Sequence, residues 1–286
     1  MKPGATATLL ITCQDRKGLV AAVSEFIWRN DGNVIHADQH TDEAEGTFLQ
    51  RVEWDLAGFR LPRARIAEAF RPIAERFDMT WELRSSDEVA SVAILVSNQA
   101  HCMHDLLARW RMREFRAEIR LVISNHPDHE PLARQFGVDY LHLAVTPETR
   151  VAQEKRMRAE LQKRNVDIVV LARYMQILSE DFVAAYPNRI INIHHSFLPA
   201  FAGRRPYHQA HERGVKLIGA TAHYVNAELD QGPIIEQDVV RVSHRDSVAD
   251  LATKGRDLEK VVLARAVRHH LRHRVVVYGN KTVVFD

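Results

Sequence analysis

The sequence predicts an α/β protein of two domains: a ferredoxin-like βαββαβ domain, followed by a Rossmann-like domain with a mostly parallel sheet. Residues 6–84 alternate short β-branched runs with amphipathic segments in the order β-α-β-β-α-β. Residues 89–193 repeat a strand–helix unit, which is typical of parallel strands joined by helical crossovers. The polar stretch 85–88 separates the two patterns, so the predicted boundaries are 1–84, a linker at 85–88, and 89–286.

The first domain is expected to contain four strands and two helices. From Leu19 onwards, apolar residues recur at helical spacing, and the Asn30–Asn33 stretch ends that helix with residues that tolerate left-handed geometry. The strands are predicted at 6–12, 34–40, 47–56 and 79–84, and the helices at 19–28 and 62–77.

The second domain is expected to alternate strands with helices up to residue 193. Strands are predicted at 89–96, 118–124, 140–143, 167–171 and 190–193, and helices at 102–112, 130–136, 147–164 and 180–186. An apolar run at 217–225 leads into a polar loop that ends at Gly232-Pro233. A long helix over 247–273 and a hairpin around Gly279-Asn280 complete the chain.

Composition excludes several classes of protein. The 286 residues are 46% apolar, which is a globular composition, and 39 basic residues against 37 acidic ones give a net charge of +2. This balance argues against a dedicated nucleic-acid surface. No run approaches the roughly eighteen apolar residues of a membrane span. No secretory signal is visible, and Cys13 and Cys102 are expected to be buried free thiols, so a cytoplasmic protein is predicted.

Polar side chains follow the buried run at 190–193 and recur in the loop before Gly232. Asn192 could stabilise an oxyanion, His194 could move a proton, and Asp230 could orient and charge the imidazole. In open α/β sheets, ligands bind at the carboxyl ends of strands, so two neighbouring strand ends could deliver this set. A histidine beside a strand end is more often a packing or solvated residue, and spacing alone leaves its role open.

Four motifs make the assignment more specific: NIHHSFLPAF, PYHQA, GATAHYV and LDQGPII. They resemble the folate-dependent formyl-transfer superfamily, and nearly the whole chain is most similar to its deformylase branch. The resemblance implies hydrolysis of 10-formyltetrahydrofolate to formate and tetrahydrofolate, within one-carbon metabolism and purine biosynthesis. Asn192 would then be the oxyanion donor and His194 the proton carrier, with Asp230 orienting His194 and water. Folate would be the substrate, with no metal and no redox cofactor.

The same resemblance implies where the substrate binds. The stretch LARYMQIL resembles the superfamily's pterin-binding segment, in which main-chain groups grip the heterocycle, and it supplies Tyr174, Met175, Gln176, Ile177 and Leu178. Gln176 stands where relatives more often carry Arg or Lys, and Ala227 stands where they commonly carry Asp. Thr221 and His223 face the same way on the preceding strand and are expected to support the site. A buried core histidine is the alternative for His223.

The opening motifs ITCQDRKGLVAAVSEFI and GNVIHADQHTD resemble an ACT domain, a small regulatory module. The resemblance implies an amino acid or similar effector at Asp15, Gly18 and Asn33, and assembly into a homo-oligomer. The alternative to effector binding is a purely local structural role, in which Gly18 permits a turn and Asn33 caps one.

Other functions remain open. Transferases that use glycinamide ribonucleotide have a glycine-rich phosphate loop after the first strand, whereas residues 96–104 contain no glycine, which favours water as the acceptor. A transferase acting on methionyl-tRNA would need a further C-terminal domain. A non-catalytic folate or amino-acid sensor is a third possibility. A zinc enzyme is disfavoured, because none of the histidine groups has a cysteine or carboxylate partner at ligand spacing: 101 with 104, 208 with 211, and 269, 270 and 273.

Overall fold

The structure is a computed structural model that describes residues 4–199 and 206–286. The chain divides into two compact units. The first consists of Met1–Val89 together with Arg272–Asp286, and the second of Ala90–Leu271. Among the described residues, no helix is both long enough and apolar enough to cross a bilayer.

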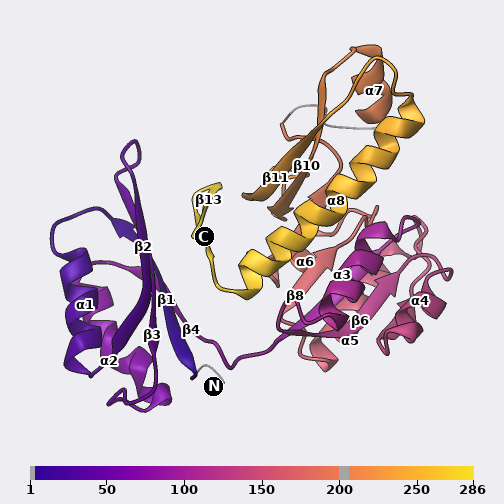
Figure 1. Cartoon of the computed structure of the whole chain (residues 1–286). Coiled ribbons are helices and arrows are strands. Elements are labelled where there is room, and N and C mark those ends of the chain that lie inside the picture. Colours follow the sequence, from indigo (N-terminus) through magenta and orange to yellow (C-terminus); the bar gives the residue numbers. More distant parts are fainter. Residues whose placement is uncertain (1–3, 200–205) are drawn as a thin grey trace. The chain divides into compact units, whose positions relative to one another are not determined.

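The first unit has the predicted ferredoxin-like order (Figure 1). Its elements are β1 (Thr6–Gln14), α1 (Leu19–Arg29), β2 (Asn33–Asp42), β3 (Thr47–Asp55), α2 (Arg63–Arg76) and β4 (Thr80–Ser85). The strands form an antiparallel sheet in the order β2-β3-β1-β4. Because side chains alternate along β1, Leu9 and Ile11 pack in one core with Phe26 of α1 and Phe70 of α2.

The opposite face of this sheet is covered by the C-terminal hairpin, β12 (Val275–Tyr278) and β13 (Lys281–Val284). Leu10 and Leu49 form a second core with Val276 and Phe285. The sequence analysis assigns 272–286 to the second domain, and the structure instead groups these residues with the first unit. The physical reason is that β1 and β3 are buried on both faces, and Leu10 and Leu49 on the second face need an apolar cover.

The second unit begins with the predicted strand–helix alternation. Its elements are β5 (Ala90–Val96), α3 (His101–Arg111), β6 (Ala117–Ser124), α4 (Glu130–Gln135), β7 (Asp139–His142), α5 (Arg150–Lys163), β8 (Ile168–Leu171), α6 (Glu180–Ala184), β9 (Ile190–His194), α7 (Pro206–Glu212), β10 (Leu217–Tyr224), β11 (Ile234–Arg241) and α8 (Val248–Leu271). Helix α5 begins at Arg150 and not at the predicted residue 147, while α7 and β11 have no counterpart in the predicted elements.

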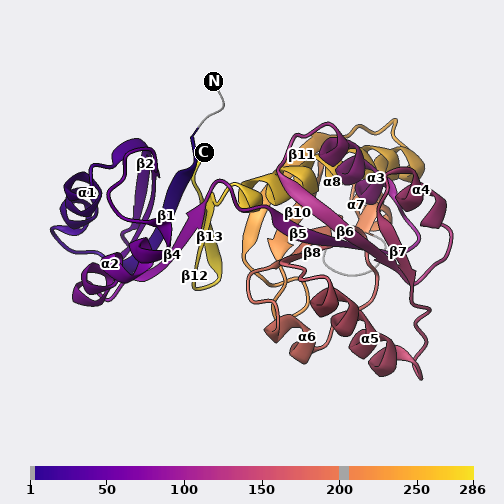
Figure 2. The same cartoon turned by 90° about the horizontal axis from the view of Figure 1, so that it is seen from below.

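Within the described residues, the sheet of this unit has seven strands in the order β11-β10-β9-β8-β5-β6-β7. Strands β9, β8, β5, β6 and β7 are parallel to one another, whereas β10 is antiparallel to both of its neighbours. Helices α3, α4 and α8 cover one face of the sheet, and α5 and α6 cover the other (Figure 2). The chain leaves β5 toward β6 and β7, and then crosses to β8 on the other side of β5. The crevice at the carboxyl ends of β5 and β8 is therefore a topological switch point.

Candidate functional site

Four of the predicted site residues share one face of the sheet. Asn192 and His194 are two residues apart on β9, so their side chains point the same way. On the neighbouring strand β10, His223 pairs with Asn192 and Thr221 pairs with His194. Directly opposed residues of an antiparallel pair project to the same side of a sheet. The structure therefore gathers two imidazoles, an amide and a hydroxyl on adjoining positions.

Asp230 reaches this face by a route that the sequence analysis did not predict. Strand β10 runs antiparallel to β9, so its carboxyl end lies beside the amino end of β9, where Val225 N donates to Ile190 O at 2.9 Å. The following loop then turns back, and the backbone of Asp230 is left-handed with φ 57°. A Cβ on Gly232 would lie 1.8 Å from Tyr224 O, so only glycine permits this return.

The Asp230 carboxylate contacts both histidines. His194 Nδ1 lies 3.2 Å from Asp230 Oδ2, and His223 Nε2 lies 3.6 Å from Asp230 Oδ1. The hydrogen bond from His194, and then the contact with His223, hold the pKa of Asp230 well below its ordinary value. The carboxylate is therefore ionised at neutral pH, and it accepts the Nδ1 proton of His194.

The second ring nitrogen of His194 has no hydrogen-bond partner among the described residues, although the residue is only 6% exposed. Buried polar atoms are almost always satisfied, so an unsatisfied one needs an explanation. With Nδ1 occupied by Asp230, Nε2 is the atom of this ring that is free to exchange a proton with a ligand.

The tautomer of His223 follows from its partners and orients Asn192. His223 Nδ1 lies 2.8 Å from Tyr224 O, and because a carbonyl oxygen only accepts, Nδ1 carries a proton. When Nδ1 carries the only ring proton, the Nε2 atom accepts from Asn192 Nδ2 at 3.1 Å. This bond uses one of the two amide protons of Asn192 and leaves the other to donate elsewhere.

Thr221 is fully buried and holds the turn that follows the histidines. Its hydroxyl donates to Ser196 O at 2.9 Å and accepts from Leu198 N at 3.0 Å. Gln237 Nε2, from β11, also donates to this hydroxyl at 2.9 Å. Thr221 thus holds the backbone of the turn between Ser196 and Leu198. The sequence analysis missed Gln237, because a polar residue on an edge strand has no local signal.

The adjacent histidines have different neighbours. His194 lies against Asp230, whereas the ring centroid of His195 lies 6.1 Å from that of Tyr207, and the two imidazoles are stacked 5.0 Å apart. Burial, and then the positive charge of Arg173, lower the pKa of His195 from 6.5 to about 4. His195 is therefore neutral at physiological pH. The motif around these residues ends at Ala200 and Phe201, which lie outside the described residues.

The predicted substrate segment follows β8, whose carboxyl end adjoins that of β9 because the two strands are parallel. Tyr174 is buried, and burial raises its pKa to about 12. Met175 N donates to Ser97 Oγ, and Arg150 donates to Ile177 O, so the segment is anchored by two residues that the sequence analysis missed. Met175 and Ile177 are 62% and 58% exposed, and Gln176 and Leu178 are partly buried.

The three residues predicted to bind an effector do not form one site within a single chain. Asp15 and Gly18 lie together in the turn after β1, where Gly18 is left-handed with φ 95°. Asn33 begins β2 and pairs with Asp55, which also pairs with Thr6 at the other end of β1. The length of β1 therefore separates Asn33 from the other two residues.

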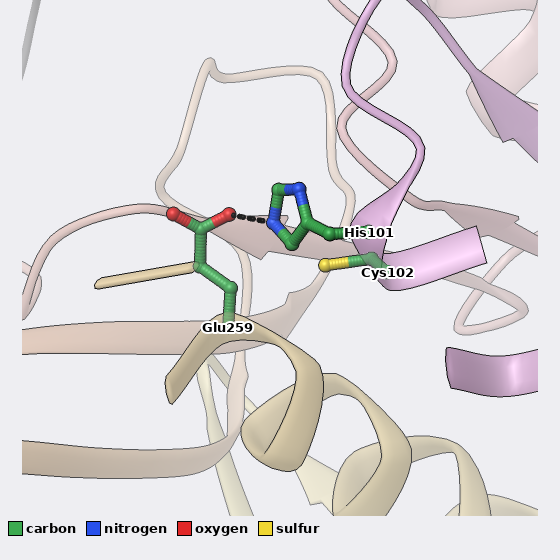
Figure 3. A group of neighbouring side chains, drawn as sticks. All are labelled: His101, Cys102 and Glu259. Atoms are coloured by element: carbon green, nitrogen blue, oxygen red, sulfur yellow. Dashed lines mark hydrogen bonds and ion pairs between the residues drawn. The ribbon is translucent and has the colours of Figure 1, made fainter. Parts of the chain in front are cut away.

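Among the described residues, one group of side chains could hold a metal ion: His101, Cys102 and Glu259, whose ligand atoms lie within 4.8 Å of one another (Figure 3). The sequence analysis found no carboxylate partner for His101, because Glu259 is 158 residues away along the chain. Both cysteines are free and buried, as predicted.

Comparisons with known proteins match both units. The family described as formyl transferase matches residues 90–267, and the ACT domain family matches residues 7–75. The formyltetrahydrofolate deformylase of Synechocystis is 60% identical over 280 residues, which span 98% of each chain. That of Escherichia coli K12 is 42% identical over 95% of each chain.

Solved structures agree with these relatives. The crystal structure of a formyltetrahydrofolate deformylase from Pseudomonas syringae matches with a TM-score of 0.97 at 46% identity, covering 100% of this chain and 96% of the other. A glycinamide ribonucleotide transformylase from Symbiobacterium toebii matches with a TM-score of 0.66 at 34% identity, covering 72% of this chain and 98% of that one.

Proposed function

The chain belongs to the formyltetrahydrofolate deformylases, a family of enzymes, and on that premise we propose that its second unit hydrolyses 10-formyltetrahydrofolate to formate and tetrahydrofolate. In this reaction, water adds to the formyl carbon, and a tetrahedral intermediate with a negatively charged oxygen forms. The bond between that carbon and N10 then breaks, N10 takes up a proton, and formic acid ionises to formate. The site must therefore stabilise an oxyanion and move one proton from water to nitrogen.

His194 is the proposed proton carrier. Its Nδ1 proton is held by Asp230 at 3.2 Å, so Nε2 presents a lone pair that can take the proton of the attacking water. Asp230 is ionised and stabilises the imidazolium that results. The imidazolium then returns the proton to N10 as the carbon–nitrogen bond breaks. Asp230 Oδ1, which lies 3.6 Å from His223, is also placed to accept from the attacking water.

Asn192 is the proposed donor to the oxyanion. Its amide is oriented by His223, which accepts one of its protons, and the second proton is then available to the developing charge. A donor that is fixed before the reaction needs no reorganisation when the charge appears. His223 is accordingly assigned a positioning role, in which it acts through Asn192 and Asp230.

The folate is proposed to bind beside the loops that follow β8, β9 and β10. Large apolar side chains are exposed on all three loops: Met175, Ile177, Phe197 and Leu229. Exposed apolar side chains on neighbouring loops suit a flat heteroaromatic ligand. Main-chain groups of the segment from Tyr174 to Leu178 are proposed to hold the pterin. Thr221 is proposed to support the site by holding the turn that follows β9. No metal or redox cofactor is expected.

The first unit is proposed to regulate the enzyme by binding an amino acid or a similar effector near Asp15 and Gly18, and to assemble the chain into a homo-oligomer. The edge strand β2 supports assembly, because Val34 and Ile35 are 40% and 52% exposed beside unpaired backbone groups. Light scattering measures the oligomer, and titration with amino acids detects an effector. A cytosolic location is expected, in keeping with two reduced thiols.

The observation that carries the proposal is the buried, unpaired Nε2 of His194 on a ring whose other nitrogen contacts an ionised Asp230. The test is to incubate the purified protein with 10-formyltetrahydrofolate, with and without glycinamide ribonucleotide, and to follow formate. We expect formate release without the amine and loss of this release in Asp230→Ala. Turnover that requires the amine would identify a transferase, and near-normal hydrolysis by a folded Asp230→Ala would refute the assigned roles.

A further inference from the structure

His194 and His195 are neighbours in the sequence, and their rings are stacked. The ring centroids lie 5.0 Å apart, and the ring planes are inclined by 30°. Consecutive residues of a regular strand project to opposite faces, so they do not stack in this way. Strand β9 ends at His194, and Thr221 holds the following turn through Ser196 O and Leu198 N. This turn places the ring of His195 against that of His194.

His195 also lies beside Tyr207 of α7. The two ring centroids are 6.1 Å apart, and the ring planes are tilted by 51°. Aromatic rings at such separations attract one another beyond the effect of the area that they bury. The partly buried ring of His195 is therefore restrained by rings from two segments, β9 and α7.

Tyr207 is in turn anchored to α8. Its hydroxyl donates to Glu259 Oε1 at 2.9 Å, and a Cβ added to Gly255 would lie 2.0 Å from the tyrosine Oη. Burial, and then the charge of Glu259, raise the pKa of Tyr207 above its ordinary value, so the hydroxyl keeps the proton that it donates. The other carboxylate oxygen of Glu259 lies 2.8 Å from His101 Nε2 (Figure 3). The anchor of Tyr207 is therefore itself held in place.

His195 is uncharged at physiological pH. Burial, and then the charge of Arg173, lower its pKa to about 4. A second cation stacked on His194 would disfavour protonation of His194, because like charges disfavour each other. The proposed proton transfer turns His194 into an imidazolium. An uncharged ring can support His194 through this step without opposing it.

The ring of His194 needs such support. Asp230 contacts it at one atom, Nδ1, at 3.2 Å, and a single hydrogen bond does not fix the tilt of a ring about that atom. The unpaired Nε2 must stay aimed at the reacting atoms, and a misplacement of about 1 Å can cost about a hundredfold in rate. Contact with the ring of His195 limits this tilt.

We propose that His195 is a positioning residue: stacked on His194 and restrained by Tyr207, it keeps Nε2 of His194 aimed at the formyl group while the proton moves. This inference rests on the proposed hydrolysis and deepens it, because it identifies a residue that acts through the proton carrier. Glu259 contributes by anchoring Tyr207.

The test compares two substitutions of His195 in the full-length protein. His195→Ala removes the ring, whereas His195→Phe keeps a planar ring without a titrating nitrogen. His208→Ala is the matched control, because His208 is an exposed histidine next to Tyr207 on α7. Formate release at increasing concentrations of 10-formyltetrahydrofolate gives kcat and KM, and circular dichroism checks the fold.

We expect His195→Ala to lower kcat about tenfold, which corresponds to about 1.4 kcal/mol, and to change KM by less than about threefold. His195→Phe should keep kcat within about threefold of the wild type, because it keeps the stacked ring. His208→Ala should match the wild type. A folded His195→Ala with the wild-type kcat overturns the proposal, and so does an equal loss in His195→Phe or in His208→Ala.

A double-mutant cycle with Tyr207→Phe separates positioning from a general loss of stability. Tyr207→Phe removes only the hydroxyl that Glu259 accepts, and it should lower kcat by about two- to fivefold in the wild-type background. In the His195→Ala background it should lower kcat no further, although it should still lower stability. An equal fall in kcat in both backgrounds overturns the proposal.

If His195→Ala does not fold, His195→Gln, which also lacks the ring, replaces it in both measurements with the same expected results. Formate release by the wild type tests the proposed hydrolysis separately. Absence of formate refutes the hydrolysis, whereas normal formate release by both the wild type and the ring-deleted variant refutes only the positioning role of His195.

Discussion

The second unit contains two carboxylate–imidazole clusters that use the same chemical groups to different ends. Asp230 has a side chain that is 22% exposed, and it contacts two histidines, one of which keeps a buried nitrogen unpaired. Glu259 is 1% exposed, and both of its oxygens are engaged by His101, Tyr207 and Arg173. The unpaired ring nitrogen of His194 can exchange a proton with a ligand. The carboxylate of Glu259 has both oxygens engaged and can only hold a shape or a charge, although the adjacent Nε of Arg173 has no hydrogen-bond partner among the described residues.

Removal of the charge of Asp230 should have the largest effect on activity. Asp230→Asn keeps the size of the side chain, and asparagine tolerates the left-handed backbone at this position. We expect kcat for formate release to fall by about a hundred- to ten-thousand-fold, because His194 loses the group that stabilises its cation. Circular dichroism should show a folded protein. A fall in kcat smaller than tenfold would contradict the proposed difference between the Asp230 and Glu259 clusters.

Removal of the charge of Glu259 should act mainly on stability. Glu259→Gln leaves Arg173 buried without its counter-charge, and breaking a buried pair in this way costs about 3–5 kcal/mol. Urea unfolding followed by circular dichroism measures this loss. Asp257→Asn should change stability by less than about 1 kcal/mol, because its ion pair is exposed. Equal losses in the two variants would contradict the account.

Asn192 tests the oxyanion role within the first cluster. Asn192→Ala should lower kcat by about a hundred- to a thousand-fold, the usual cost of losing one oxyanion donor, and KM should change little. His223→Ala should also lower kcat, but by a smaller factor, since His223 acts by orienting Asn192. An increase in KM alone would assign Asn192 to substrate binding.

The pH dependence of stability gives the smallest effect and involves both units. Burial and neighbouring positive charge lower the pKa values of His195 and His273 from 6.5 to about 4. Their unfolded forms therefore bind protons between these values while the folded forms do not, so stability falls as the pH drops from 6.5 to 4. Each residue should contribute about 2–3 kcal/mol over this window.

His273→Asn should reduce the pH dependence of stability for the first unit, because asparagine has no titrating side chain. Asparagine also accepts the left-handed backbone of His273, so the fold should be kept. Thermal unfolding midpoints at several pH values provide the measurement. A midpoint profile that is identical in the variant and the wild type would show that His273 is not the titrating group.

The sequence predicted most of the fold because local patterns were strong. Apolar periodicity located the elements of both units, and the ferredoxin-like order was confirmed. The position of the C-terminal hairpin was missed, because its cover of Leu10 and Leu49 depends on pairing between distant segments. Antiparallel pairing of β10 was missed for the same reason, since hydrophobicity along a buried strand carries no direction.

The site was predicted from its motifs more than from its geometry. The motifs led to Asn192, His194 and Asp230, which the structure brings to one face of the sheet. Spacing gave no indication of the Glu259 cluster, because its members come from four segments and Glu259 lies within a long helix. A buried charge in a helix has no signature in sequence unless its partners are already known.

The account depends most on His194, and one measurement on His194→Gln tests it directly. Equilibrium binding of 10-formyltetrahydrofolate and single-turnover formate release should be measured on the same preparation. We predict that the variant binds the folate within about threefold of the wild-type affinity and releases formate at least about a hundredfold more slowly. Formate release at the wild-type rate by a variant that binds folate normally would contradict the proposed role of the His194–Asp230 pair.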